Sequence, residues 1–211
     1  MIEKKEAELI NIDENFENAV DMAREFFLRG SIFIYPTDTI YGFGGNPFNE
    51  GAIKKISEVK GKVNWHRYIF LISDIEILKS YADVNSERYL DFLLSIWPNP
   101  ISVILKLKKK YRQLLRSETG AFRIPNHRFC YKLISELKMP LISTSVNRTG
   151  NEPMNDSSII IQEFLSEVDA IFYSDKKSFF EASTLIDLTG KEPKLVREGR
   201  IKFVELMKKL N

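Results

Sequence analysis

Apolar positions along the chain follow a helical period in some segments and form short β-branched runs in others. Helical spacing predicts a helix over residues 16–27, with Asp13 as its N-cap and Gly30 as its stop. The same period predicts helices over residues 53–59, 87–97, 129–137, 158–166 and 203–210. Apolar or alternating runs predict strands over residues 32–35, 68–72, 101–107, 121–124, 140–144, 170–173 and 184–188.

The order of these segments indicates the fold class. Strands and helices mostly alternate, and at least two pairs of strands follow one another directly, so we expect an α/β protein with a mixed sheet. The sequence has no internal repeat, low-complexity tract or linker rich in Pro, Gly or Ser. We therefore expect residues 1–211 to form a single domain, a length sufficient to bury a sizeable core.

Composition narrows the class of protein. Hydrophobic residues make up 44% and charged residues 28%, as in ordinary globular proteins. The net charge of +2 does not by itself predict a polyanionic partner, so any basic site must come from local clustering. Cys130 is the single cysteine and cannot form an intrachain disulfide, which fits a reducing compartment. No apolar run approaches the ~20 residues of a membrane span. We expect a cytoplasmic protein without a membrane partner.

The segment at residues 35–44 changes abruptly from an apolar strand to polar and small residues. Pro36 fixes φ and lacks an N–H group, so it should end the strand at residues 32–35. Thr37 and Asp38 then offer hydroxyl and carboxylate groups, and the glycines that follow let a ligand approach the backbone. Polar side chains at the carboxyl end of a buried strand are typical of ligand sites. An ordinary strand-to-loop transition is the alternative.

Two further clusters carry binding chemistry. Lys60 and Lys62 lie two residues apart just past a predicted helix, and paired ammonium groups suit an anion such as a triphosphate. The alternative is a solvated loop whose lysines complement the helix dipole. The second cluster follows the strand expected over residues 140–144, where small polar groups either hold a phosphate or carboxylate or form an ordinary turn. Its members are Ser143, Ser145 and Asn147.

Two arginines are candidates for anion contacts. Arg123 interrupts an apolar strand between Phe122 and Ile124, and a buried guanidinium needs an anionic partner. That partner is either an internal carboxylate or a bound ligand. Arg197 precedes Gly199, and its alternative is a solvated charge after a strand.

Other chemistries have little support in the sequence. His66 and His127 fit no metal-site spacing, and Cys130 lies in an apolar helical pattern that places it in the core. No convincing catalytic triad or dyad is present, and no P-loop or Rossmann glycine pattern occurs. The basic run over residues 106–116 either contacts RNA phosphates or forms a solvated strand end and loop, and we favour the second interpretation.

Six segments occur in the same order as in the YrdC-like family, and together they cover nearly the whole chain from about residue 12 to 205. Each motif is weak alone, whereas six in order are specific, so the chain resembles this family. The segments are residues 35–44, 60–62, 97–102, 122–125, 143–150 and 182–190 with 195–199.

The resemblance implies a twisted mixed parallel/antiparallel sheet with surrounding helices and a concave basic cavity. The best-known family members are L-threonylcarbamoyladenylate synthases, so it also implies a nucleotidyltransferase. Such an enzyme makes threonylcarbamoyl-AMP and pyrophosphate from L-threonine, bicarbonate or CO₂, and ATP, for the threonylcarbamoyl modification of tRNA adenosine 37. It implies Mg²⁺ held mainly by the ATP phosphates, and partner proteins that transfer the threonylcarbamoyl group. Weak direct binding of tRNA is left open.

The resemblance also assigns residues. No side chain is expected to act as a nucleophile, and catalysis should rest on positioning and on charge neutralisation by Lys60 and Lys62. The threonine-binding residues are Thr37, Arg123, Ser143 and Ser183. The ATP-binding residues are Lys60, Lys62, Thr119, Ser145, Asn147 and Arg197.

The chain departs from the family in several places, and residues 63–66 lack the proline that usually follows the basic pair. Lys62 replaces an arginine, which keeps the charge but loses the planar fork. Arg67 and Tyr68 replace the usual Pro-Leu, and Glu198 replaces a proline as in the YciO-like branch. That branch lacks the pair Ser145-x-Asn147 retained here. Two alternatives therefore remain: a YciO-like member with a different substrate, and a non-catalytic RNA-binding module.

Overall fold

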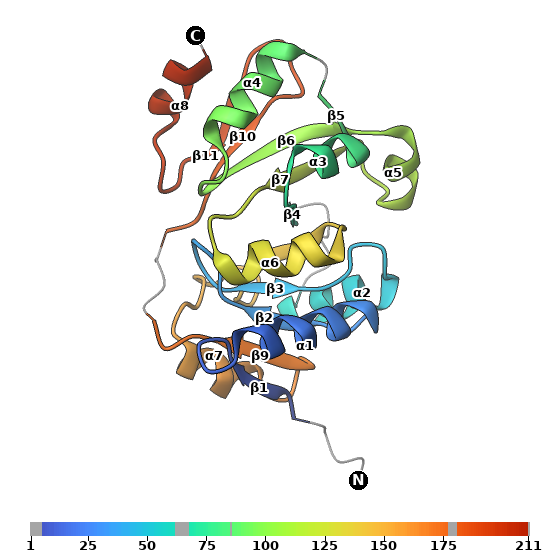
Figure 1. Ribbon diagram of the computed structural model, residues 1–211, viewed down its shortest axis with the longest axis vertical. Helices are drawn as coiled ribbons and strands as arrows, with labels where there is room; N and C mark the ends of the chain where they lie inside the picture. Colours follow the sequence, from blue (N-terminus) through green and yellow to red (C-terminus); the bar gives the residue numbers. More distant parts are fainter. Residues whose placement is uncertain (1–5, 62–67, 85, 177–180, 211) are drawn as a thin grey trace.

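The computed structural model describes residues 6–61, 68–84, 86–176 and 181–210, which form helices packed on one long, twisted sheet (Figure 1). The helices are α1 (Phe16–Leu28), α2 (Glu50–Lys60), α3 (Ile75–Tyr81), α4 (Glu87–Ile96), α5 (Lys109–Leu114), α6 (Arg128–Leu137), α7 (Ser157–Phe164) and α8 (Phe203–Leu210). The strands are β1 (Glu8–Asn11), β2 (Phe33–Tyr35), β3 (Gly42–Gly44), β4 (Ile69–Leu71), β5 (Ala82–Asp83), β6 (Ile101–Leu107), β7 (Thr119–Arg123), β8 (Leu141–Ser145), β9 (Ala170–Tyr173), β10 (Thr184–Asp187) and β11 (Lys194–Arg197).

The elements expected from the apolar pattern are present, most with ends shifted by a few residues, and β6, β9 and α8 have the expected bounds. The N-cap expected at Asp13 is wrong. Asn15 caps α1 instead, because its side-chain oxygen accepts from the backbone N–H of Asn18 at 3.2 Å. The Asp13 carboxylate accepts from the Ser174 hydroxyl at 2.7 Å and from Lys176 at 2.9 Å.

The apolar pattern did not predict several of the observed helices and strands. They lack a long apolar run: β3 reads Gly-Phe-Gly, and the side chains of β11 are all exposed. Part of the basic run expected to be a loop forms α5. The unexpected elements are β1, β3, β5, β11, α3 and α5.

The sheet is mixed, as expected. Its strand order is β1-β9-β2-β3-β8-β4-β7-β6-β10-β11, with β5 paired to β6 off this path. Pairs β1/β9, β2/β9, β4/β7 and β6/β10 are parallel, and the other pairs are antiparallel.

Strand β8 joins the two halves of the sheet. Its residues Thr144 and Ser145 pair with β3, whereas its earlier residues 141–143 pair with β4. In Figure 1 the half that contains β1, β9, β2 and β3 lies at the bottom and the half that contains β6, β10 and β11 lies at the top. Each path through the paired strands from one half to the other therefore passes through β8.

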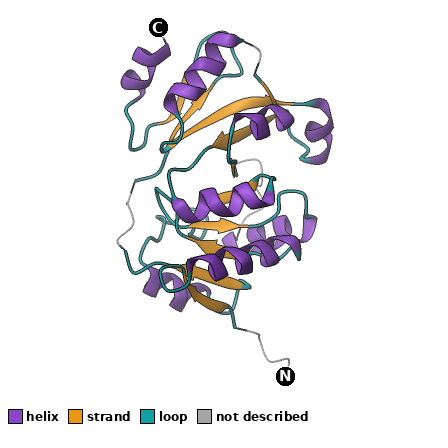
Figure 2. Ribbon diagram, viewed as in Figure 1, coloured by secondary structure: helices purple, strands orange, loops and turns teal. Residues whose placement is uncertain are grey.

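The continuous apolar run of β2 is explained by burial on both faces of the sheet. Phe33 and Tyr35 pack in a cluster with side chains of α1 and α6, whereas Ile32 and Ile34 pack in a second cluster with side chains of α2 and α7. Figure 2 shows α1 and α6 in front of these strands. None of the described helices is both long enough and apolar enough to span a membrane.

Candidate functional site

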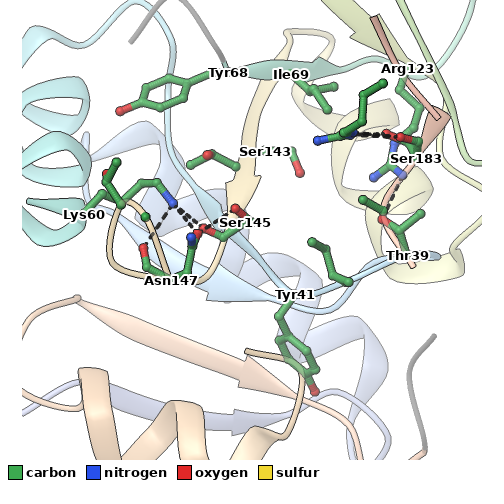
Figure 3. A pocket seen from close by; sticks show the side chains of 16 residues that line it. Thr39, Tyr41, Lys60, Tyr68, Ile69, Arg123, Ser143, Ser145, Asn147 and Ser183 are labelled. Atoms are coloured by element: carbon green, nitrogen blue, oxygen red, sulfur yellow. Dashed lines mark hydrogen bonds between the residues drawn. The ribbon is translucent and has the colours of Figure 1, made fainter. Parts of the chain in front are cut away.

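A cavity of about 500 Å³ lies beside β8, with walls from both halves of the sheet (Figure 3). It is the concave basic cavity that the resemblance implied. Of the ten side chains assigned to ligands from the sequence, seven line it: Lys60, Arg123, Ser143, Ser145, Asn147, Ser183 and Arg197.

One end of the cavity is built around Lys60, the last residue of α2. Its ammonium group donates to the backbone oxygen of Ser145 at 2.5 Å and to the side-chain oxygen of Asn147 at 2.8 Å. The Ser145 hydroxyl donates to the same Asn147 oxygen at 2.7 Å. The Asn147 amide in turn donates to the backbone oxygen of Asn151 at 2.6 Å. This network brings together the three ATP-binding candidates of this end.

The surroundings of Lys60 supply dipoles but no counter-charge from the described residues. The side chain is 9% exposed, and its ammonium group lies 5.4 Å from the centre of the Phe43 ring. Burial lowers the pKa of Lys60 to about 8, because removal from water disfavours the charged form. An anion that entered here would supply the missing counter-charge, which makes this end suited to a phosphate.

The other end of the cavity contains Arg123, the last residue of β7, which is 2% exposed. Its Nη1 donates to the Thr39 hydroxyl at 2.9 Å and lies 3.4 Å from the Asp38 carboxylate. The other Asp38 oxygen accepts from the backbone N–H of Asn126 at 3.2 Å. The internal carboxylate expected as one alternative is therefore present. The guanidinium nevertheless lines the cavity, and its buried Nε has no hydrogen-bond partner among the described residues.

A second guanidinium reaches this end from β11. Arg197 donates from Nη2 to the Ser183 backbone oxygen at 2.9 Å and to the Ser183 hydroxyl at 3.3 Å. The Ser183 hydroxyl also lies 2.8 Å from that of Ser102. Although Arg197 is exposed overall, its guanidinium is partly removed from water, and this desolvation together with the positive charge of Arg123 lowers the pKa of Arg197. Arg123 and Arg197 thus place two cations at this end, and Asp38 pairs with Arg123 alone of the two. This end is suited to a further anion.

Gly199 allows the chain after β11 to approach Ser183. A Cβ atom at this position would lie 2.2 Å from the backbone oxygen of Ala182 and 2.6 Å from the backbone carbon of Ser183. The Gly199 N–H donates to the Thr184 hydroxyl at 3.0 Å. Only glycine fits this contact, which holds Arg197 beside the cavity.

Of the assigned residues that the structure describes, Thr37 and Thr119 do not line the cavity. Thr37 is buried, and its hydroxyl donates to the backbone oxygen of Ile40 at 2.8 Å, so it holds the turn after β2. Thr119 begins β7, opposite Lys106 and at the other end of the strand from Arg123. Lys62 lies outside the described residues.

The cavity also contains residues that the sequence did not assign. Thr39, Tyr41, Thr144 and Thr149 line it, and each belongs to a motif noted above, so motif membership was the available signal. Tyr68 lines it too, although the sequence marked it only as the start of an expected strand and as a departure from the family. Its hydroxyl lies 3.1 Å from that of Ser57 on α2, and burial raises the pKa of Tyr68.

The departure at Glu198 has a structural explanation. The Glu198 carboxylate does not line the cavity. It accepts from the backbone N–H of Phe203 at 3.1 Å and from Lys202 at 3.2 Å, at the start of α8. The residue therefore stabilises the beginning of a helix.

The other residues weighed in the sequence are the cysteine, the two histidines and the basic run, and the structure gives none of them a place in the cavity lining among the described residues. Cys130 is buried, as expected, and its thiol donates to the Pro36 backbone oxygen at 3.3 Å. His127 is half-buried at the start of α6, and His66 lies outside the described residues. In the described ranges, no group of three or more His, Cys, Asp or Glu side chains could hold a metal ion. Two arginines of the basic run are engaged in ion pairs, Arg112 with Asp83 and Glu118 and Arg116 with Glu50.

The fold and the cavity together define an α/β protein with a basic, hydroxyl-lined cavity beside the central strand of a twisted mixed sheet. Comparison with known families identifies it further. The family model Sua5_yciO_yrdC, described as "Telomere recombination", matches residues 25–199. The chain belongs to the Sua5/YciO/YrdC family.

Individual relatives agree with this placement. The chain is 28% identical over 203 residues to the threonylcarbamoyl-AMP synthase of Pyrococcus abyssi, and this match covers 95% of the chain. The crystal structure of P. abyssi Sua5 complexed with L-threonine is similar at a TM-score of 0.87 and 27% identity, over 95% of this chain. The crystal structure of Escherichia coli YciO is similar at a TM-score of 0.83 and 25% identity, over 94% of this chain.

The two relatives differ in the share of their length that is matched. The chain spans 60% of the Pyrococcus protein and 97% of E. coli YciO.

Proposed function

We propose that this chain is an L-threonylcarbamoyladenylate synthase. The observation that carries the proposal is a single cavity with a basic group at each end and hydroxyl groups between them, in a chain of this family. The P. abyssi relative named threonylcarbamoyl-AMP synthase, and the L-threonine complex of P. abyssi Sua5, support it. The substrates are then L-threonine, bicarbonate or CO₂, and ATP.

We assign the phosphates of ATP to the Lys60 end. Lys60 supplies the positive charge, and the Ser145 hydroxyl and the Asn147 amide supply neutral polar groups beside it. Lys62, which lies outside the described residues, would add a second ammonium group near this end. Arg197 is assigned to the nucleotide from the other side of the cavity.

We assign the carboxylate of threonine to the Arg123 end. Arg123 keeps donors beyond those used by Thr39 and Asp38, the Ser183 hydroxyl lies at the same end, and Ser143 lines the cavity between the two ends. Thr37 would act there through the turn that it shares with Thr39. Thr119 has no place in this scheme, since it lies at the opposite end of β7 from Arg123.

The reaction follows from these assignments. The threonine amine adds to the carbon of CO₂ and loses a proton, giving N-carboxy-threonine. Its new carboxylate oxygen attacks the α-phosphorus of ATP, the bond from this phosphorus to the bridging oxygen breaks, and pyrophosphate leaves. No protein nucleophile is required, so the chain contributes positioning and neutralisation of phosphate charge.

Mg²⁺ fits this site as part of the ATP complex. Its chemistry there is to neutralise phosphate charge. At the phosphate end the chain offers the neutral oxygens of Ser145 and Asn147, and no cage of acidic side chains occurs among the described residues. Phosphates and water would therefore supply most of the ligands. The product would be consumed by partner proteins that transfer the threonylcarbamoyl group to adenosine 37 of tRNA.

The test is pyrophosphate release from ATP and Mg²⁺ with threonine and labelled bicarbonate, followed by detection of the adenylate. We expect release only when threonine and bicarbonate are both present. Equal turnover without threonine would replace this function by a broader adenylating one.

A second candidate is a YciO-like activity on a different substrate, which Glu198 and the structural similarity to E. coli YciO favour. Adenylate formation that depends on another carboxylic or amino acid would select it. The non-catalytic RNA-binding alternative predicts steep salt dependence of RNA binding and no ATP turnover.

A further inference from the structure

Arg148 follows Asn147 directly, but its side chain does not line the cavity. Its guanidinium connects the end of α2 to α7. Nη1 donates to the backbone oxygen of Val59 at 2.6 Å. The guanidinium also donates to the Glu163 carboxylate at 2.9 Å and to the two Glu167 oxygens at 2.7 and 2.8 Å. Three acceptors therefore fix its orientation, and the two carboxylates raise the pKa of Arg148.

Val59 directly precedes Lys60 in the last turn of α2, so the bond from Arg148 to the Val59 backbone oxygen helps to fix the backbone that carries Lys60. The last four carbonyl groups of a helix have no partner within the helix. Arg148 satisfies the one on Val59, and the N–H of Thr149 satisfies the next, donating to the Lys60 backbone oxygen at 2.8 Å. Two neighbouring residues thus hold the final turn of α2.

The side chain of Lys60 is also linked to Arg148, through two aromatic rings. The Arg148 guanidinium lies 4.7 Å from the centre of the Phe164 ring. Phe164 packs edge-to-face on Phe43, with 5.2 Å between the ring centres, and the Lys60 ammonium group lies 5.4 Å from the centre of the Phe43 ring. Arg148 therefore supports Lys60 both at its backbone and beneath its ammonium group.

We propose that Arg148 is a positioning residue, which sets the place of the Lys60 ammonium group in the cavity through α2 and the Phe164–Phe43 pair. This inference rests on the proposed function for its consequence, namely the contact of Lys60 with the nucleotide phosphates. A displacement of about 1 Å at such a contact costs up to roughly 100-fold in rate or affinity.

The competing interpretation gives Arg148 a structural role only, as an ion pair between α7 and the neighbouring loop. Arg148→Lys separates the two, because lysine keeps the charge but cannot reach a carbonyl and two carboxylates with one planar group.

The chain offers a closely matched control. Arg112 donates to the backbone oxygen of Leu107 at 2.5 Å and also pairs with two carboxylates, those of Glu118 at 3.2 Å and Asp83 at 3.6 Å. Its side chain is 34% exposed, against 32% for Arg148, and it does not line the cavity. Arg112→Lys therefore removes the same kind of contact away from the site.

The experiment compares both variants with the unaltered protein by thermal melts, by calorimetric titration with Mg·ATP and with threonine, and by NMR titration of the Lys60 side chain. We expect Arg148→Lys to weaken ATP binding at least tenfold, with threonine affinity changed less than twofold. The pKa of Lys60 should rise from about 8 toward its ordinary value of 10.5, because a displaced ammonium group regains contact with water. Arg112→Lys should change neither quantity.

Other outcomes decide against the proposal. If both variants lose similar stability while ATP affinity and the Lys60 pKa stay unchanged, Arg148 is only structural. If the unaltered protein binds no ATP, the proposed function fails, and the NMR titration alone decides whether Arg148 positions Lys60. If Arg148→Lys does not fold, Glu163→Gln is measured in its place, and an unchanged Lys60 pKa in that variant overturns the proposal.

Discussion

The guanidinium group of Arg123 lies 3.4 Å from the carboxylate of Asp38, and both side chains are buried. The pair explains how an apolar strand tolerates an arginine, because an unpaired interior charge is very costly. The pair with Asp38 occupies only part of the Arg123 guanidinium group. The Nε donor is buried without a partner among the described residues, and such a donor is stabilised by any acceptor that reaches it.

Arg123→Lys should lower threonine affinity by at least tenfold while ATP affinity changes little. Lysine keeps the charge for Asp38 but loses the planar fork that holds a carboxylate at two points. Separate titrations with threonine and ATP, together with a thermal melt, measure this. A variant that melts early yet binds threonine normally would leave Arg123 with its Asp38 pair alone.

Raising the pH should weaken ATP binding through Lys60. With a pKa of about 8, this side chain is mostly charged at pH 7 and about one-tenth charged at pH 9, so affinity should fall about tenfold between them. Lys60→Arg, whose charge persists over this range, should bind ATP without this dependence. A Kd that stays constant in the unaltered protein would contradict the placement of phosphate beside Lys60.

The same pKa predicts the sign of a stability change. The pKa of Lys60 is about 8 in the folded chain and about 10.5 when the side chain is free, so the unfolded chain binds more protons between these values. The contribution of Lys60 to the free energy of unfolding should therefore increase as pH rises from 8 to 10.5. Denaturant melts of the unaltered protein and Lys60→Met across this range isolate the contribution.

Gly199→Ala should displace the chain that carries Arg197. Its new methyl group would meet the backbone of residues 182 and 183, which cannot rotate away as a side chain can, and such overpacking costs about 1–3 kcal/mol. Gly190→Ala is the control, since a Cβ there lies no closer than 3.7 Å to a neighbour. Thermal melts and ATP titrations of both variants check this, and equal behaviour would show that the loop can move.

Glu198→Ala should leave threonine and ATP affinities within twofold of the unaltered protein, because the carboxylate bonds to the start of α8 outside the cavity. Its effect should be confined to the melting temperature. A change in which amino acid supports pyrophosphate release would instead make Glu198 part of substrate choice.

The apolar pattern predicted the long, buried strands well and missed strands that are rich in glycine or exposed at an edge of the sheet. Runs such as Ile101–Leu107 and Ala170–Tyr173 are recognisable because burial selects their side chains directly. Strand β3 contains two glycines and β11 lies at an edge with exposed side chains, so their pairing depends on neighbours distant in sequence. Propensity and periodicity carry no information on such partners.

Site residues were predictable where they belong to a family motif and lie at the end of a strand that the sequence pattern predicts. Ser145 is the last residue of β8, Asn147 follows it, and both contact Lys60, as expected of residues at one sheet edge. Thr119 belongs to the same strand as Arg123 but to its other end, a distinction that composition cannot make. Arg148 lies within the segment 143–150, but the sequence gave no indication of its contacts, because its acceptors lie 15, 19 and 89 residues away.

The position of β8 has a mechanical consequence. Thr144 and Ser145 pair with one half of the sheet, and residues 141–143 pair with the other. This short strand is therefore the seam, that is, the one described strand that connects the two halves. The Lys60 end of the cavity belongs to α2, on the side of β2 and β3, whereas Arg123 and Arg197 belong to strands on the opposite side. A molecule held at both ends would tie the halves together across the seam, and a local opening of either half would release it.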